Sequence, residues 1–186
     1  MDTQTRNYCL RAVAYLKSEV TDDREVHITL SERDSPVLRK LGHGLLAAYL
    51  VDEGEYFSYV QHGHLADSLL NCDELHAHAV ANLSALVEKD AEVRPYGNIY
   101  TVLMGGNFEA SIILVEEFWS EWYAQLGPDG FVAAFPARDL LAFGNASAAV
   151  VSELNQFLER VNHGLDHPLN SNLFRRVGSA WVPFLG

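Results

Sequence analysis

Residues 131–144 read FVAAFPARDLLAFG, and this stretch decides the fold class. Two apolar runs, 131–135 and 140–143, flank the four residues from Pro136 to Asp139. Both runs are apolar on both faces, which is typical of strands in the middle of a sheet that is covered on each side. Pro136 suits the first corner of a type I turn. The stretch therefore predicts a hairpin of two central strands.

Turn signals elsewhere predict more hairpins of the same kind. The residues of the expected turns are Asp52-Glu53-Gly54-Glu55, Gly97-Asn98 and Gly178-Ser179, each between two short apolar runs. A further short strand is expected at 27–30, and Pro183 places the last strand at a sheet edge. Strands joined by tight turns pair in antiparallel fashion. We therefore expect an α+β fold, with a mixed, largely antiparallel sheet packed by about four helices, in a single domain of residues 1–186.

Apolar residues at helical spacing predict the helices that cover this sheet. The second of them begins with Asn71 and Glu74, which have the spacing of a capping box. The third carries an apolar stripe through Trp119 and a polar stripe that includes Glu109. The expected helices are 9–20, the segment from Asn71 to Leu86, 108–126, and a segment capped by Asn145 and ended by Gly164.

The charge of the chain bears on its partners. It has 186 residues, a formal net charge of −12, and 13 lysines and arginines that form no obvious stripe. An acidic surface repels phosphate backbones and anionic lipids, so we expect neither nucleic acid nor a membrane as partner. No apolar run is long enough to span a bilayer, and no secretory signal is visible, which predicts a soluble cytoplasmic protein. A basic protein stays open as a partner, and the oligomeric state is not predicted.

Histidines and cysteines invite a metal or nucleophile interpretation. His76 and His78 lie on an expected helix, where residues two apart point away from each other and cannot hold one ion. His62 and His64 share a face at an expected strand end, but no cysteine or carboxylate completes a metal pattern. Cys72 follows a helix N-cap, a place that can activate a thiol, yet no histidine partner can be assigned. We expect no metal, no cofactor and no catalytic residue.

One glycine-rich connection is a candidate ligand site. It runs from an expected strand into an expected helix start, which can present unpaired N–H groups to a phosphate or carboxylate. It lacks the lysine of a P-loop, so the simpler interpretation is a tight connection capped by its asparagine. In the ligand hypothesis an arginine binds the anion and a carboxylate acts as general base, which requires two segments to converge in space. The candidate residues are Gly105, Gly106, Asn107, Glu109, Arg138 and Asp139.

Several segments together resemble a known family. They are SPVLRKLGHGLLAAYLVDEGEYFSYVQHGHLADSL, DELHAHAVANL, GGNFEASIILVEEFW and FVAAFPARDLLAFG, in this order. The chain resembles, over residues 35–145, the YtpQ-like family of uncharacterised bacterial proteins, a domain of unknown function. The most specific pieces are 107–111, 81–83 and the element around Pro136 and Asp139. The resemblance implies a cytosolic bacterial protein of mixed α and β structure and implies no activity.

Three functions are open as hypotheses. The first is a non-catalytic binding or interaction module, one form of which is an immunity-type neutraliser of a basic toxin. The second is a small-molecule enzyme or ligand sensor with an anion site near 105–107 and Arg138. The third, a structural subunit, requires Trp119, Trp122 and Tyr123 to be exposed as one patch, whereas their spacing favours packing of the two tryptophans in the core.

Overall fold

The computed structural model of the chain describes residues 2–19, 30–126, 130–161, 165 and 167–185. In this part of the chain it contains five α-helices, one 3-10 helix and ten strands. The strands form two sheets, and their paired neighbours are antiparallel. The predicted α+β class is confirmed, and the one expected sheet is present as two. The chain divides into two compact units, unit 1 (Met1–Leu83) and unit 2 (Ser84–Gly186).

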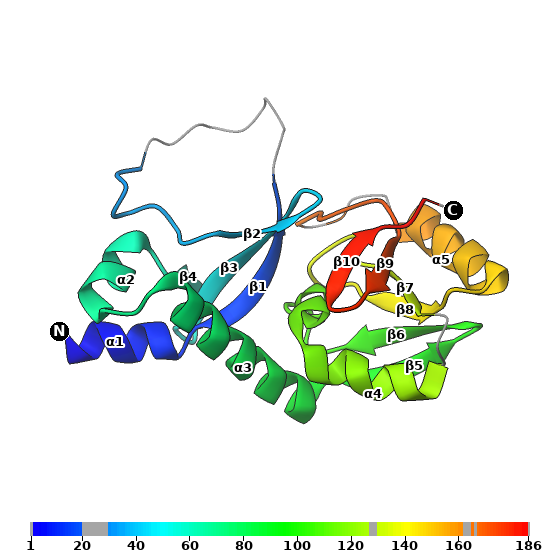
Figure 1. The fold of residues 1–186 in the computed structure, drawn as a ribbon, viewed down its shortest axis with the longest axis horizontal. Helices are drawn as coiled ribbons and strands as arrows, with labels where there is room; N and C mark the ends of the chain where they lie inside the picture. Colours follow the sequence, from blue (N-terminus) through cyan, green and yellow to red (C-terminus); the bar gives the residue numbers. More distant parts are fainter. Residues whose placement is uncertain (1, 20–29, 127–129, 162–164, 166, 186) are drawn as a thin grey trace. The chain divides into compact units, whose positions relative to one another are not determined.

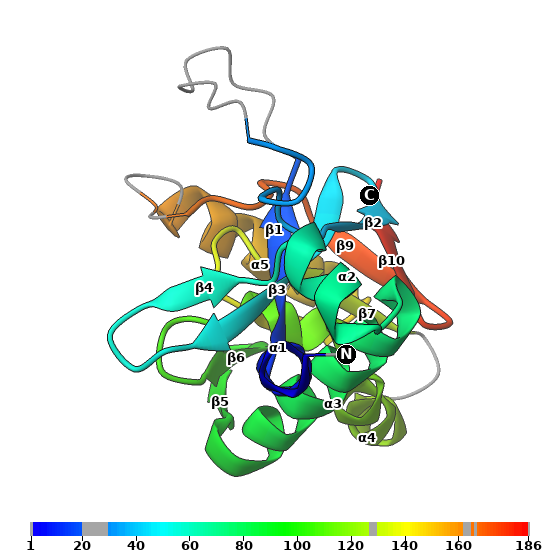
Figure 2. The ribbon, with the colours of Figure 1, turned by 90° about the vertical axis from the view of Figure 1, so that its left-hand side faces the viewer.

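Unit 1 is built on a four-stranded sheet with the order β1-β3-β2, in which β4 also pairs with β3. The central strand β3 is buried from Leu45 to Val51, has paired neighbours on both edges, and contacts α3 through Tyr49 and His76. The predicted hairpin around 52–55 is confirmed by the pairing of β3 with β4 (Figure 2). The elements are α1 (Thr3–Leu10), β1 (Val13–Ser18), β2 (Arg39–Gly42), β3 (Leu45–Asp52), β4 (Phe57–Tyr59), α2 (His62–Ser68) and the first part of α3 (Cys72–Asp90).

The helix predicted over 9–20 is wrong. Helix α1 ends at Leu10, and the residues after it form strand β1, with Leu16 opposite Ala47 of β3. The cause is a continuous apolar run: residues 14–16 are all buried, which no single helical stripe can achieve. Cys9 is nevertheless a buried free thiol, as expected, and burial raises its pKa.

The start of α3 confirms the predicted capping box. The Asn71 backbone N–H donates to Glu74 Oε2 at 2.9 Å, and the Asn71 side chain accepts from the N–H groups of Asp73 and Glu74. Further along, Asn82 donates through Nδ2 to the carbonyls of Leu10 and Ala12, each at 2.8 Å. Asn82 therefore fixes the corner where α1 turns into β1. Helix α1 also packs against α2, as Figures 1 and 2 show.

Replacing Asn82 tests this corner. We expect Asn82→Ala to lower the free energy of unfolding by about 2 kcal/mol, because two carbonyls in a half-buried place lose their donors. Urea denaturation measures the change. The exposed His78 on the same helix supplies the control, and His78→Ala should change stability by less than about 0.5 kcal/mol. Equal stabilities of the two variants would contradict the assignment.

Unit 2 contains a six-stranded sheet with the order β10-β9-β7-β8-β6-β5. The stretch 131–144 supplies its two central strands, as predicted, and β10 with Pro183 lies at one edge. The turn lies two residues later than expected, since Leu140 N–H donates to the Ala137 carbonyl and Arg138, not Pro136, is its first corner. The elements are the rest of α3, β5 (Glu92–Tyr96), β6 (Ile99–Leu103), η1 (Ala110–Leu114), α4 (Glu116–Leu126), β7 (Phe131–Ala134), β8 (Ala142–Asn145), α5 (Ala148–Val161), β9 (Phe174–Val177) and β10 (Ala180–Pro183).

The two faces of this sheet carry different helices (Figure 1). Val132 and Ala142 point to the face that packs against Val150 and Leu154 of α5. Strand alternation sends Phe143 and its neighbours to the other face, where aromatic side chains meet α4. The fully buried Trp119 of α4 lies among three of these rings, which confirms its core position and removes the basis of the structural-subunit hypothesis. The rings are Phe131, Phe143 and Trp181.

The single helix predicted over 108–126 is also wrong. A 3-10 helix, η1, ends before Val115, which is extended at φ −94° and ψ 98°, and α4 begins only at Glu116. The residues from Phe108 to Ile113 are buried on all sides, which a helix with one polar stripe cannot be. Two η1 carbonyls accept from the indole N–H groups of Trp119 and Trp181, at 2.9 and 3.0 Å.

The remaining expectations have mixed outcomes. The hairpins at 97–98 and 178–179 are confirmed. Helix α5 starts after Ser147, whose Oγ accepts from Val150 N–H, while the Asn145 side chain accepts from Ser147 N–H, so Asn145 is not the cap. The strand at 27–30 and the helix stops at 127–128 and Gly164 fall wholly or mainly outside the described residues. None of the described helices is both long and apolar enough to cross a bilayer.

Candidate functional site

The glycine connection between β6 and η1 is held by a buried carboxylate. Glu109 is only 2% exposed. Its Oε1 accepts from the N–H groups of Met104 and Gly106, both at 2.7 Å, and its Oε2 accepts from Phe108 N–H at 3.1 Å. Gly105 and Gly106 have φ angles of +79° and +84°, which residues with a side chain rarely adopt. The expectation that Glu109 lies on an outward polar stripe is wrong.

This geometry gives the loop an internal anion. The Gly106 N–H is a group that the ligand hypothesis assigned to an external phosphate or carboxylate, and it donates to Glu109 instead. A carboxylate bonded to three amides is also poorly placed to take a proton from a substrate. Ligand binding at Gly105, Gly106 and Asn107 stays a prediction, while the hydrogen bonds give Glu109 a structural role.

The second segment of that hypothesis does lie beside the first. Ala110 N–H donates to the Arg138 carbonyl at 3.0 Å, so the loop before η1 and the turn after β7 converge, as the hypothesis required. Arg138 is half-buried, and Asp139 is exposed in the turn. This convergence brings Arg138 near the loop, and Asp139 faces solvent.

The histidines and Cys72 that invited a metal or nucleophile interpretation do not form a metal site in the described part of the chain. His62 and His64 lie in the first turn of α2, which corrects the expected strand end, and His64 Nδ1 accepts from Gln61 N–H at 3.2 Å. His76 Nδ1 is 3.2 Å from the Tyr49 hydroxyl. Burial lowers the pKa of His76 and raises that of Tyr49 to about 12. Cys72 is an exposed free thiol, and no group of three metal-ligating side chains is found within the described residues.

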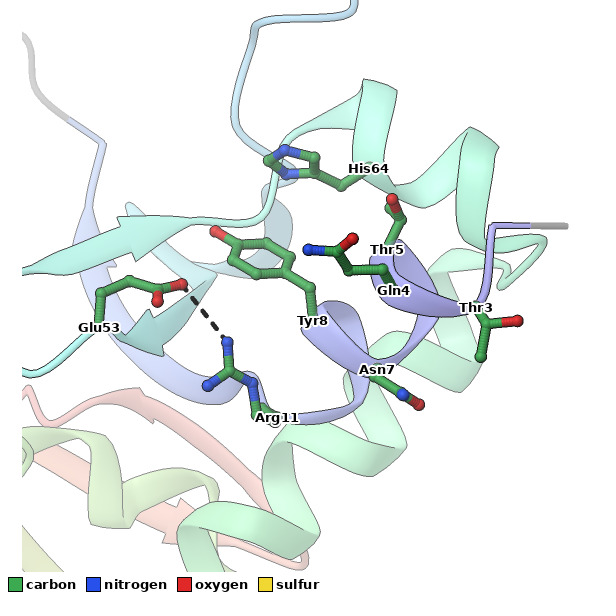
Figure 3. A pocket seen from close by; sticks show the side chains of 8 residues that line it. All are labelled: Thr3, Gln4, Thr5, Asn7, Tyr8, Arg11, Glu53 and His64. Atoms are coloured by element: carbon green, nitrogen blue, oxygen red, sulfur yellow. Dashed lines mark hydrogen bonds and ion pairs between the residues drawn. The ribbon is translucent and has the colours of Figure 1, made fainter.

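Unit 1 has a polar hollow beside α1, with a volume of about 730 Å³ (Figure 3). The Tyr8 and His64 rings meet edge to face at 4.8 Å, and burial raises the pKa of the Tyr8 hydroxyl. At the other end, Arg11 pairs with Glu53 at 3.5 Å. Figure 3 shows Asn7 directed away from His64, so the lining side chains do not converge on one point. This hollow is therefore a weaker candidate for a binding site than the groove beside α4 in unit 2, which is described next.

Helix α4 presents a better-formed site on one of its sides. A groove of about 500 Å³ runs between α4, the end of α3 and strand β5. We call it the acidic groove. Its lining is Ser84, Val87, Glu88, Ala91, Val93, Val115, Glu117, Phe118, Glu121 and Trp122. Three of these residues are glutamates, and none is a lysine or arginine.

The aromatic part of the groove is held firmly. Trp122 is half-buried, and its ring contacts Tyr100 at 4.8 Å and Phe143 at 5.1 Å between centroids. Phe118 also packs against Phe143, at 5.9 Å. These contacts with β6 and β8 fix both α4 rings before any partner arrives. The surface can thus offer a preformed apolar wall beside exposed carboxylates, the arrangement that suits a cation with an apolar stem.

The sequence contains a signal for this groove that the predicted single helix obscured. Glu117 and Glu121 are four residues apart, as are Phe118 and Trp122, so on a helix each pair forms a neighbouring row. The interpretation of 108–126 as one helix gave weight to the stripe through Trp119 instead. Glu88 could not have been joined to this group, because its place depends on the tertiary packing of α3.

No family model matches the chain, and comparisons with curated proteins and with solved structures found no match either. Evidence for the function therefore comes from the chain's own geometry.

Glu109→Gln tests the structural role of the buried carboxylate. The amide keeps one oxygen for Met104 and Gly106 but turns an NH₂ group toward Phe108 N–H, so two donors face each other. We expect a loss of about 2 kcal/mol in the free energy of unfolding, measured by urea denaturation. The exposed Glu117 gives the matched control, and Glu117→Gln should stay within about 0.5 kcal/mol of the wild type. An unchanged stability of Glu109→Gln would refute the role.

Proposed function

We propose that this protein is a non-catalytic interaction module that binds a basic protein through the acidic groove of unit 2. The groove carries the proposal because it joins three carboxylates to two half-buried rings, with no lysine or arginine among the described residues that line it. Lysine and arginine side chains match this combination. Their charged heads meet carboxylates, and their apolar stems lie along aromatic surface.

The contacts define how such a side chain would bind. Glu117 and Glu121 lie one helical turn apart, about 6 Å between Cβ atoms, and form a row beside the row of Phe118 and Trp122. A cation between them can also lie over the Trp122 ring, where cation–π attraction adds about 0.5–2 kcal/mol. Glu88 extends the negative charge to α3, so a basic segment with more than one cationic residue fits better than a single charge.

The charge of the whole chain supports the same partner class. A net charge of −12 attracts a cationic protein over a long range and raises the rate of encounter, especially at low ionic strength. One form of the proposal is an immunity-type neutraliser of a basic toxin in the bacterial cytoplasm. Membership of the YtpQ-like family is part of the same proposal and adds no activity to it.

The alternative, a small-molecule enzyme or sensor at the glycine loop, has weaker support. Its anion site needs the Gly106 N–H, which Glu109 already occupies, and its general base would be either that same carboxylate or the exposed Asp139. The convergence of the loop with Arg138 is the observation in its favour.

A cationic peptide tests the proposal. The probe is a synthetic arginine- and leucine-rich peptide, compared with the same peptide carrying citrulline in place of arginine, which keeps the shape and removes the charge. We expect the charged peptide alone to shift the backbone amide NMR signals of the groove. Replacing Glu88, Glu117 and Glu121 with glutamine should weaken its binding about tenfold, since each exposed pair contributes up to about 1 kcal/mol.

A second triple variant separates the groove from net charge. Glu55→Gln, Asp139→Asn and Glu159→Gln remove three negative charges from exposed positions that do not line the groove. This control should bind the peptide nearly as well as the wild type. If the two triple variants lose the same affinity, or if the citrulline peptide binds equally well, the acidic groove is not the binding surface and the proposal fails.

A further inference from the structure

The opposite side of α4 lines a second, separate pocket. It has a volume of about 380 Å³, a size that suits a small molecule. Glu116, Trp119, Ser120 and Tyr123 contribute to it, since residues three and four apart share one side of a helix. The start of β7 and the end of β9 complete its lining. Among the described residues, this pocket and the acidic groove have no lining residue in common, so a ligand here is independent of the proposed function.

The pocket contains a buried cation. The Arg176 side chain is only 7% exposed, and its Nη2 donates to Glu116 Oε2 at 2.5 Å. Its guanidinium carbon lies 6.0 Å from the ring centroid of Trp119 and 5.7 Å from that of Trp181. The pairing of β9 with β10 sets Trp181 opposite Arg176, which holds the guanidinium against the rings. An arginine fixed in this way is preorganised to bind a planar carboxylate.

The partner of Arg176 narrows the ligand class. Glu116 is 57% exposed, so its carboxylate can move aside or accept a second cation without unfolding the helix. A ligand with only a negative charge would be attracted by Arg176 and repelled by Glu116. A ligand with only a positive charge would be attracted by Glu116 and repelled by Arg176. A molecule that carries both charges satisfies both side chains at once. Part of the remaining lining is aromatic: Tyr123 is 49% exposed, and its ring contacts the buried Phe131 at 5.9 Å.

We propose that this pocket binds a free amino acid with an apolar or aromatic side chain. The ligand carboxylate pairs with Arg176, its ammonium group pairs with Glu116, and its side chain packs on Tyr123. In the absence of the ligand the two protein charges neutralise each other, as the ion pair shows. Two glycines also line the pocket, Gly130 and Gly178, and neither contributes a side chain to it.

Three probes that differ in charge test the ligand class. L-phenylalanine carries both charges, phenylacetate lacks the ammonium group, and phenethylamine lacks the carboxylate. We expect isothermal titration calorimetry to detect L-phenylalanine binding, and each singly charged analogue to bind at least about tenfold more weakly, because Arg176 or Glu116 then has no partner in the ligand. Absence of L-phenylalanine binding at millimolar concentrations, or equal binding of the three probes, would overturn the proposal.

Adjacent glutamates on α4 provide matched variants for the same titration. Glu116→Gln removes the ammonium partner, so it should weaken L-phenylalanine about tenfold and leave phenylacetate unweakened. Glu117→Gln makes the same change on the groove side and should alter neither affinity. Both positions are exposed, so both variants should fold. If the two variants affect L-phenylalanine equally, or if Glu116→Gln weakens both probes alike, the site is not where we place it.

Discussion

The structure of unit 2 depends on one buried carboxylate. The Glu109 carboxylate accepts from three backbone N–H groups of the loop after β6 and thereby holds the turn of the chain from the sheet into η1. The carbonyls of η1 then accept from the indole N–H groups of Trp119 and Trp181, which connects η1 to α4 and to β10, the edge strand of the sheet. Helix α4 lines both the acidic groove and the Arg176 pocket. The geometry of each proposed site therefore depends on the loop that the Glu109 carboxylate holds.

Two polar residues from the stretches on which the predicted family resemblance was based have structural roles. Glu109 satisfies loop amides, and Asn82 satisfies the carbonyls at the corner between α1 and β1. Both are polar side chains that pair with backbone groups which a regular helix or strand leaves open. The surfaces proposed to bind partners lie elsewhere, on the two sides of α4. Glu109 and Asn82 therefore report on how the chain folds and say little about what it binds.

Local signals predicted the elements that local interactions decide. The hairpins at 52–55, 97–98 and 178–179 and the capping box at Asn71 depend on residues close in sequence, and all were found. The helices over 9–20 and 108–126 failed, because periodicity cannot distinguish a stripe from a segment buried on all sides. Arg176 was missed for a related reason. Its burial depends not only on the nearby Trp181 of β10 but also on Trp119 of α4, which is distant in sequence.

Hydrogen exchange of the Gly106 amide tests the central claim most directly. Gly106 is an exposed residue in a loop, and its N–H has protection only if the Glu109 carboxylate holds it. Measured by NMR on the wild-type chain, this amide should exchange at least about a hundredfold more slowly than in an unstructured peptide, together with those of Met104 and Phe108. Exchange of Gly106 at the unstructured rate would show that the carboxylate does not organise the loop.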